Sequence, residues 1–432
     1  MKIPKRIASA IINSLKGGVV PRIGLPYITV GREQEINALL HDVDIIADGG
    51  ASFRFIVGKY GSGKSFLLQT IRSYVMDRNF VVVDADLSPE RRLHGTKGQG
   101  LATYKELIRN MSTKTRPDGG ALTLILDRWI SNVQSETAAE SGLDTNDPQF
   151  RKAVERKIYE VIGALHEMVH GFDFARLLTL YYNAYWEGDD ECKAKVVKWF
   201  RGEYNTKTEA RAELGVNIII TDDDWYEYIK LFAMFLKKAG YSGMLVLIDE
   251  LVNIYKIPHS ITRLTMYNDT MQGKAQYLGI IMGGTPQCIE DTRRGVYSYE
   301  ALRSRLAEGR FAQEGMRDML APVIHLNALT NEELLVLTEK LTEIHAQLFG
   351  YTPTLTQEDR ILFLQIEFGR IGADSHITPR EVIRDFIELL DIIFQNPQMH
   401  VAELLQSDQF SYAAAQPEGD QSVAPEFAEF DI

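Results

Sequence analysis

The chain has 432 residues, of which 45% are hydrophobic and 25% are charged, and its formal net charge is −12. This composition is typical of a globular protein, and the length is sufficient for two or three domains. No stretch approaches the ~20 apolar residues that a membrane-spanning helix requires, so we expect neither a helical membrane protein nor a membrane partner.

The charge distribution says little about partners, whereas the cysteines suggest a location. Residues 401–432 carry seven acidic residues and no lysine or arginine, which is more than half of the net charge. The rest of the chain is only mildly acidic, which neither indicates nor excludes nucleic-acid binding. Cys192 and Cys288 lie far apart, and no histidine or cysteine spacing fits zinc, so we expect free thiols in a cytoplasmic protein.

The first thirty residues contain five basic residues and no acidic one. Residues 4–16 place aliphatic side chains at helical spacing, which predicts a helix that packs one stripe on the body. Polar residues interrupt its apolar run, so we expect a mature helix and not a signal peptide. Membrane or DNA contact through the basic flanks is an alternative. Pro21 and Pro26 then predict an extended linker.

The stretch GKYGSGKS follows an apolar run and precedes a helical pattern. Strand, glycine-rich loop and helix in this order are the context of a phosphate-binding loop, in which backbone N–H groups and the helix N-terminus surround phosphate oxygens. We expect Lys64 to contact the β- and γ-phosphates and Ser65 to bind Mg²⁺. A chance glycine turn is the alternative that the flanking elements disfavour. The predicted nucleotide-binding residues here are Gly58, Lys59, Tyr60, Gly61, Ser62, Gly63, Lys64, Ser65 and Phe66.

The next element, residues 80–88 (FVVVDADLS), is typical of a strand buried on both faces. A glycine-rich loop with four basic residues follows, and it is either a solvated connection or a functional contact; these residues are Arg91, Arg92, His94 and Lys97. Residues 101–240 then show helical spacing throughout. The aromatic cluster around Tyr181, Tyr182 and Trp186 fits a helix core better than a base-stacking platform.

In GMLVLIDEL, five apolar residues lead directly into Asp249 and Glu250. In a phosphate-loop ATPase, such a strand places one carboxylate on the magnesium shell, and the next can polarise the attacking water. The pattern alone is common. Together with the upstream phosphate loop it predicts Asp249 as a magnesium ligand and Glu250 as the general base.

A further buried strand, residues 278–282, leads through two glycines to Thr285. A polar residue at this strand tip would lie beside the water and the γ-phosphate, although Thr285 can also cap the helix that TPQC begins. The following helix ends with Arg303, Arg305 and Arg310, which are either a solvated face or functional groups.

Residues 322–329 predict a fifth strand, and three helices follow it. The first begins at the capping sequence TNEE, and the last begins with Thr378 as N-cap and Pro379 in its first turn. Beyond Gln395 the composition predicts a largely disordered tail.

This order of parts resembles the AAA+ ATPases, particularly the branch of origin-recognition and helicase-loading proteins. The resemblance implies an α/β fold with a parallel five-stranded phosphate-loop core and a C-terminal helical lid. It makes GKYGSGKS the Walker A motif, Asp249–Glu250 the Walker B pair and Thr285 the sensor 1 residue.

The resemblance also implies roles for residues whose own pattern is ambiguous. Arg305 is the best match to an arginine finger, with Arg303 as its rival, and Arg380 looks like sensor 2. Gly31 and Arg32 are similar to the segment that borders the adenine pocket.

One departure from the AAA+ pattern is informative. About 150 residues separate the second strand from the Walker B strand, where a short helical stretch is usual. This insertion, with the motif PERRLHGTKGQGLATYKELIRN, resembles the ATP-binding proteins of BREX phage-exclusion systems (BrxD-like) over roughly residues 20–395. The resemblance implies a helicase or other defence-system proteins as partners.

The expected organisation follows from these parts. The segments are an N-terminal basic helix and extended linker (1–30), the first half of the AAA+ core (31–100), a helical insertion (101–240), the second half of the core (241–329), a helical lid (330–395) and an acidic disordered tail (396–432).

The leading hypothesis is Mg²⁺-dependent ATP hydrolysis by a homo-oligomer, possibly a ring, that acts on or near DNA without base-specific readout as a motor or loader in BREX-like defence. The alternative is a nucleotide-switched scaffold or signalling ATPase that binds protein partners through the insertion. A phosphate-loop kinase is disfavoured by the Asp-Glu pair, which suits water activation.

Overall fold

The computed structural model describes residues 2–94, 98–145, 147–251, 262–293, 295–307, 317–369, 378–399 and 401–406. The chain divides into two compact units, which we call the sheet unit and the helical unit. The sheet unit comprises Arg32–Lys59 and Lys64–Asn327. The helical unit comprises Met1–Gly31, Tyr60–Gly63 and Ala328–Ile432.

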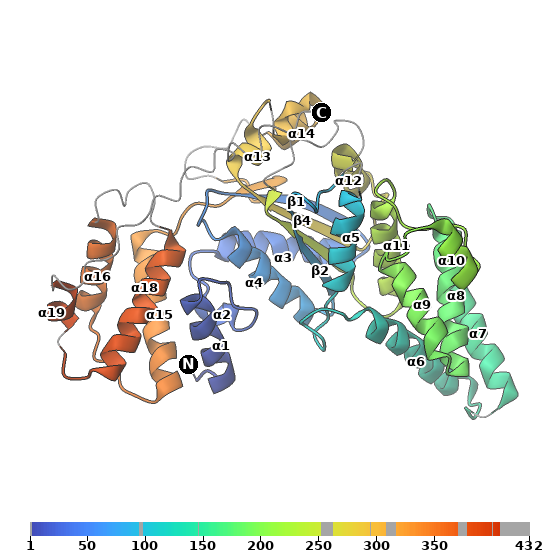
Figure 1. The fold of residues 1–432 in the computed structure, drawn as a ribbon, viewed down its shortest axis with the longest axis horizontal. Helices are drawn as coiled ribbons and strands as arrows, with labels where there is room; N and C mark the ends of the chain where they lie inside the picture. Colours follow the sequence, from blue (N-terminus) through green and yellow to red (C-terminus); the bar gives the residue numbers. More distant parts are fainter. Residues whose placement is uncertain are drawn as a thin grey trace. The chain divides into compact units, whose positions relative to one another are not determined.

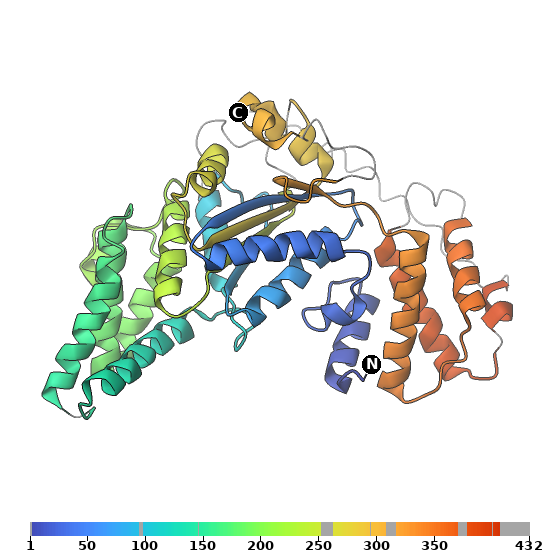
Figure 2. The same ribbon diagram turned by 180° about the vertical axis from the view of Figure 1, so that it is seen from behind.

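The sheet unit is built on a five-stranded sheet with the order β2-β3-β4-β1-β5 (Figures 1 and 2). All four strand pairings are parallel. The prediction of an α/β fold with a parallel five-stranded core is therefore confirmed. The strands are β1 (Ala51–Val57), β2 (Val81–Asp86), β3 (Met244–Asp249), β4 (Leu278–Gly284) and β5 (Val323–His325).

The strand register brings the ends of the chemically important strands to one edge. Val57 at the end of β1 pairs with Gly284 at the end of β4, and Asp86 at the end of β2 pairs with Asp249 at the end of β3. In parallel strands all carboxyl ends lie on the same side of the sheet, which is where open α/β sheets bind ligands.

Helices cover both faces of this sheet because residues within a strand alternate between the faces. On one face α3 (Glu33–Ala47) and α4 (Lys64–Asp77) bury aliphatic residues against the strands. On the other face the buried cluster continues from the strands into α5 and α11 of the insertion. β3 and β4 are buried along their whole length, as their uninterrupted apolar runs predict.

The insertion between β2 and β3 is helical, as its periodicity predicts. Its helices are α5 (Gln99–Arg109), α6 (Leu122–Ser141), α7 (Pro148–Gly163), α8 (Gly171–Glu187), α9 (Asp190–Phe200), α10 (Lys207–Leu214) and α11 (Trp225–Lys238). The ring of Phe174 lies 4.9 Å from that of Phe200 and 5.1 Å from that of Phe232. Tyr181 and Tyr182 are fully buried, so their assignment to a helix core is confirmed.

Short helices complete the sheet unit, and one buried ion pair links two of its helices. The short helices are α12 (Thr262–Met271), α13 (Pro286–Glu290), the 3₁₀ turn η2 (Val296–Ser298) and α14 (Glu300–Leu306). Lys230 Nζ of α11 lies 2.7 Å from Asp269 Oδ2 of α12, and both residues are buried.

The helical unit contains α1 (Lys5–Lys16), α2 (Leu25–Ile28), α15 (Asn331–Phe349), α16 (Gln357–Gly369), α18 (Pro379–Gln395) and α19 (Val401–Gln406). The predicted apolar stripe of α1 is confirmed, because Ala8, Ile11 and Ile12 are buried and the helix packs on α15 and α18. Capping boxes at Thr330 and Thr378 begin α15 and α18, as the sequence predicts.

Within the helical unit, His345 of α15 is fully buried in a polar cluster. Its Nδ1 lies 2.8 Å from Tyr351 Oη, and its Nε2 lies 3.1 Å from Asp391 Oδ1. Asp391 also accepts a hydrogen bond from Lys16 of α1 at 2.5 Å. Burial lowers the pKa of His345 below its usual range, and the bond to Asp391 only partly opposes this effect.

One local prediction is wrong. The linker expected to be extended contains α2, because a proline fits the first turn of a helix, where its missing N–H is not needed. Within the tail that the sequence predicts to be largely disordered, residues 401–406 form α19, in which Val401, Leu404 and Leu405 are buried. Residues 407–432 lie outside the described residues. None of the described helices is long and apolar enough to cross a membrane.

Candidate functional site

The phosphate loop leaves β1 and enters α4, whose first residue is Lys64. The Gly58 N–H donates to the carbonyl of Gly284 at 3.2 Å, which ties the start of the loop to the end of β4. Gly61 and Gly63 have φ angles of +78° and +87°, in the left-handed region that glycine adopts without steric cost. The chain therefore passes from β1 to α4 through two left-handed glycines, and the phosphate-binding role of this loop stays a prediction; four of its residues, Tyr60–Gly63, are assigned to the helical unit.

The side chain of Lys64 points back to the start of its own loop. Its Nζ donates to the carbonyl oxygens of Gly58 and Lys59, at 2.9 and 3.0 Å. Burial lowers the pKa of Lys64, and the nearby carboxylates of Asp249 and Glu250 act in the opposite direction. The ammonium of Lys64 is thus partly desolvated. An anionic ligand can replace the two carbonyl oxygens as its partner.

Ser65 and Asp249 are joined directly. The Ser65 hydroxyl donates to Asp249 Oδ2 at 2.5 Å, and Asp249 is only 9% exposed at the end of β3. The other carboxylate oxygen, Oδ1, accepts from the Glu250 N–H at 2.9 Å. A hydroxyl and a carboxylate are hard oxygen donors of the kind that Mg²⁺ takes from proteins. These two residues, distant in sequence, therefore fit a magnesium site.

Gly283 of β4 makes the space in which the Asp249 carboxylate lies. A Cβ at position 283 would lie 2.5 Å from Asp249 Oδ1 and 3.2 Å from the Leu68 side chain. Any side chain here would displace the carboxylate. Gly283 is not among the residues predicted from the sequence, although a glycine pair at the end of a buried strand is a signal for a close approach.

Glu250 is exposed and has a φ angle of +60°. A non-glycine residue in this conformation stores on the order of 1 kcal/mol or more of strain, and such residues concentrate at functional sites. The chain thus turns sharply immediately after Asp249, which separates the directions of two adjacent carboxylates. The role of Glu250 as general base stays a prediction.

Thr285 follows β4 at the same edge of the sheet and occupies the N-cap position of α13. The capping bond is absent, and the Cys288 N–H donates to the main-chain carbonyl of Thr285 at 3.0 Å. Thr285 Oγ1 lies 3.1 Å from the sulfur of Cys288, and no backbone N–H of the helix bonds to it. Its prediction as sensor 1 is not tested by this contact.

Asp86 is a carboxylate that the sequence analysis did not single out. It ends β2 directly opposite Asp249, and the N–H of Leu87 donates to the Asp249 carbonyl at 3.0 Å. Although part of the side chain is exposed, partial desolvation raises the pKa of Asp86, and the charges of Asp249 and Asp84 raise it further. The sequence DAD at the end of a buried strand was the available signal.

The arginine-finger candidates lie on α14 and are exposed. Arg305 Nη1 donates to the carbonyl of Ala301 in its own helix at 2.8 Å. Within the described ranges, no hydrogen bond or ion pair joins Arg303 or Arg305 to the phosphate loop of the same chain. Arg310 lies outside the described residues.

Arg380 and the middle of the phosphate loop meet inside the helical unit. Arg380 Nη1 donates to Tyr60 Oη at 3.2 Å, and the guanidinium lies 5.8 Å from the centre of the tyrosine ring. Gly61 lies close to Thr378, since a Cβ on the glycine would approach the threonine Cβ to 2.9 Å. The predicted sensor 2 arginine therefore contacts a loop residue in the described structure.

Gly31 and Arg32, predicted to border the adenine pocket, lie at the boundary between the two units in sequence. Arg32 is 5% exposed, and its Nη2 donates to the carbonyl of Asn327 at 2.7 Å. This bond fixes the chain ahead of α3 to the segment after β5. The adenine-binding role of both residues stays a prediction.

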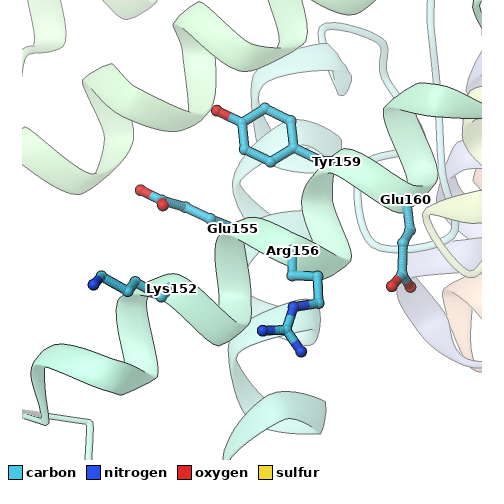
Figure 3. A pocket seen from close by; sticks show the side chains of 5 residues that line it. All are labelled: Lys152, Glu155, Arg156, Tyr159 and Glu160. Carbon is cyan, nitrogen blue, oxygen red and sulfur yellow. The ribbon is translucent and has the colours of Figure 1, made fainter.

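A separate surface recess lies on α7 and is unrelated to these residues (Figure 3). It is open to solvent and is lined by one helix only, through Lys152, Glu155, Arg156, Tyr159 and Glu160. These side chains combine both signs of charge, which is not the lining that a nucleotide phosphate requires. Across the described residues, no group of three or more histidine, cysteine and acidic side chains forms a metal site.

A family model described as BREX system ATP-binding protein BrxC/D matches residues 3–409. No curated protein matches the chain.

Proposed function

Because the chain belongs to the BREX system ATP-binding protein BrxC/D family, we propose that it hydrolyses ATP with the phosphate loop and the Asp249–Glu250 pair. The observation that carries this proposal is the 2.5 Å bond between Ser65 and Asp249. It joins the first turn of α4 to the end of β3, which is the pairing that a phosphate-loop hydrolase uses to hold its metal.

Each residue has a defined task in this proposal. Lys64 exchanges its two backbone carbonyl partners for phosphate oxygens, and Ser65 with Asp249 holds Mg²⁺. The metal, when bound, neutralises charge on the phosphate oxygens. Glu250 accepts the proton of the attacking water, and Thr285 donates its hydroxyl proton toward the γ-phosphate side of the site. Arg380, now bonded to Tyr60, is available to a bound phosphate as sensor 2.

The first experiment measures ATP hydrolysis by the full chain with Mg²⁺ and with excess chelator. Lys64→Ala should abolish nucleotide binding and turnover, because it removes the cation that contacts the phosphates. Lys152→Ala is the matched control, since this lysine lies on α7 in the insertion, outside the residues assigned to the site. Turnover that survives both chelation and Lys64→Ala would contradict the proposal.

We further propose that the active site is completed by a second copy of the chain. The support is that Arg303 and Arg305 are exposed on α14 and that Arg305 Nη1 donates to the Ala301 carbonyl of its own helix. An arginine supplied in trans is worth roughly 10³ or more in rate in phosphate-loop enzymes. The specific ATPase rate should therefore rise with protein concentration, and a constant rate in dilute monomer would oppose an in-trans finger.

A mixing experiment distinguishes the two arginines. Lys64→Ala and Arg305→Ala are each expected to be inactive alone. A mixture should recover part of the activity, because one subunit retains the loop and its neighbour retains the finger. Replacing Arg305→Ala by Arg303→Ala tests the rival residue in the same way. Recovery with neither variant would oppose an arginine supplied by either position.

We propose DNA as the object of this ATPase on the basis of the loader-like core. DNA should stimulate hydrolysis, and the stimulation should fall steeply with salt, as for a protein that binds the phosphate backbone. The second candidate is a nucleotide-switched scaffold, supported by the large helical insertion and its open α7 surface. Slow turnover that DNA does not alter, with partner binding that depends on ATP and on α7, would favour the scaffold.

A further inference from the structure

Cys288 lies on α13 and has no part in the site as described so far. Its side chain is 8% exposed, and its sulfur lies 3.1 Å from Thr285 Oγ1. Its N–H also donates to the Thr285 carbonyl at 3.0 Å. Thr285 is therefore held to Cys288 through both the main chain and the side chain.

The threonine takes this partner instead of the one that its position offers. A threonine at an N-cap ordinarily accepts a hydrogen bond from a backbone N–H in the first helical turn. At Thr285 this bond is absent, and the hydroxyl is hydrogen-bonded to the sulfur of Cys288 instead. The thiol is thus the described hydrogen-bond partner of the hydroxyl, and either atom can be the donor.

The proton inventory of the pair has a consequence for the site. A hydroxyl carries one proton and two lone pairs, and a thiol carries one proton. When the S–H donates to Oγ1, the hydroxyl proton is left for another acceptor. In the reverse arrangement the hydroxyl donates this proton to the sulfur, and it is no longer available to another acceptor.

We propose that Cys288 is a positioning residue: its thiol donates to Thr285 Oγ1 and directs the threonine's hydroxyl proton toward the γ-phosphate side of the site. This inference rests on the proposed ATPase function. A Cβ on Gly284, whose carbonyl accepts from the Gly58 N–H, would lie 3.6 Å from the Cβ of Cys288, which places Cys288 beside the start of the loop. Only hydrogen bonds change, and no covalent step is involved.

The test is a double-mutant cycle on the full chain, measured as kcat and KM for ATP. Cys288→Ala should lower kcat about three- to tenfold with little change in KM, as expected for the loss of one weak neutral hydrogen bond. Cys288→Ser should recover most of kcat, because a hydroxyl can also donate to Oγ1. Cys192→Ser, on α9 of the insertion, is the control and should leave kcat unchanged.

The second arm removes the group through which Cys288 is proposed to act. Thr285→Val lacks the hydroxyl, so Cys288→Ala added to it should cause no further loss of kcat. An equal loss in both backgrounds would overturn the inference and indicate a packing role only. If the wild type is active and Cys288→Ala has the same kcat, the inference is overturned as well. An inactive wild type that binds ATP would instead refute the proposed hydrolysis, and this inference with it.

Discussion

Substitution of Gly283 by alanine tests the arrangement around Asp249 most directly. The new Cβ would lie 2.5 Å from Asp249 Oδ1, whereas an ordinary contact begins near 3.4 Å, so the carboxylate must move by about 0.9 Å. Because Oδ1 and Oδ2 belong to one carboxylate, this displacement also disturbs the 2.5 Å bond that Oδ2 accepts from Ser65. Misplacement of a reacting or positioning group by about 1 Å can cost ~10²-fold in rate. We therefore expect kcat to fall about 100-fold and the half-saturating Mg²⁺ concentration to rise.

The assay compares ATP hydrolysis across a magnesium titration with thermal unfolding of the same samples. Gly279→Ala is the matched control, because it adds the same methyl group to the same strand. Its Cβ would lie 2.6 Å from Ile46 and 2.7 Å from Leu245, so it strains the core without touching Asp249. Overpacking of this kind costs ~1–3 kcal/mol of stability. Wild-type kinetics in Gly283→Ala, or an equal loss in both variants, would refute the proposed role of Gly283.

Three further predictions concern catalysis, stability and pH. Glu250→Gln should retain ATP binding but lower turnover by ~10²–10⁴, measured by phosphate release and equilibrium nucleotide binding; full turnover would refute the base assignment. Lys230→Met should lower the free energy of unfolding, measured with urea, by ~3–5 kcal/mol, because it leaves the Asp269 carboxylate buried without its cation. Adding Asp269→Leu should recover much of this loss. An unchanged unfolding midpoint in the single variant would contradict this account. The free energy of unfolding should fall as the pH falls from about 7.5 to about 5.5, because of His345. In the unfolded chain its imidazole binds a proton below about pH 6.5, whereas the buried imidazole of the folded protein, whose pKa is lowered, stays neutral. His345→Phe should reduce this pH dependence, and an identical dependence in both proteins would exclude His345 as its source.

The sequence was sufficient to predict the sheet and to indicate candidate site residues because the signals for both are local. The phosphate loop, the Asp249–Glu250 pair and the apolar run of each strand are contiguous patterns that need no knowledge of pairing. The α/β fold follows from these patterns, since parallel strands joined through helices bring their carboxyl ends to one edge. The family assignment needed the longer pattern of the insertion as well.

The features that escaped prediction depend on contacts between distant segments. The role of Gly283 is visible only once β4 lies beside β3, and that of Asp86 only once β2 pairs with β3. The bond between Thr285 and Cys288 replaces the capping bond that local rules favour. The short helices α2 and α19 were missed because proline-rich and acidic surroundings outweighed a few apolar residues.

The strand order has a consequence for synthesis of the chain. The two neighbours of β1 in the sheet are β4 and β5. Ala51 therefore cannot pair until its partner Leu278 has been synthesised, 227 residues later. At roughly 5–20 residues per second this interval is about 11–45 s on the ribosome. The insertion makes mostly local contacts and is able to fold during that time, whereas β1 exposes an apolar strand with both edges open. During synthesis β1 therefore stays unpaired for longer than β2, whose partner β3 begins at Met244.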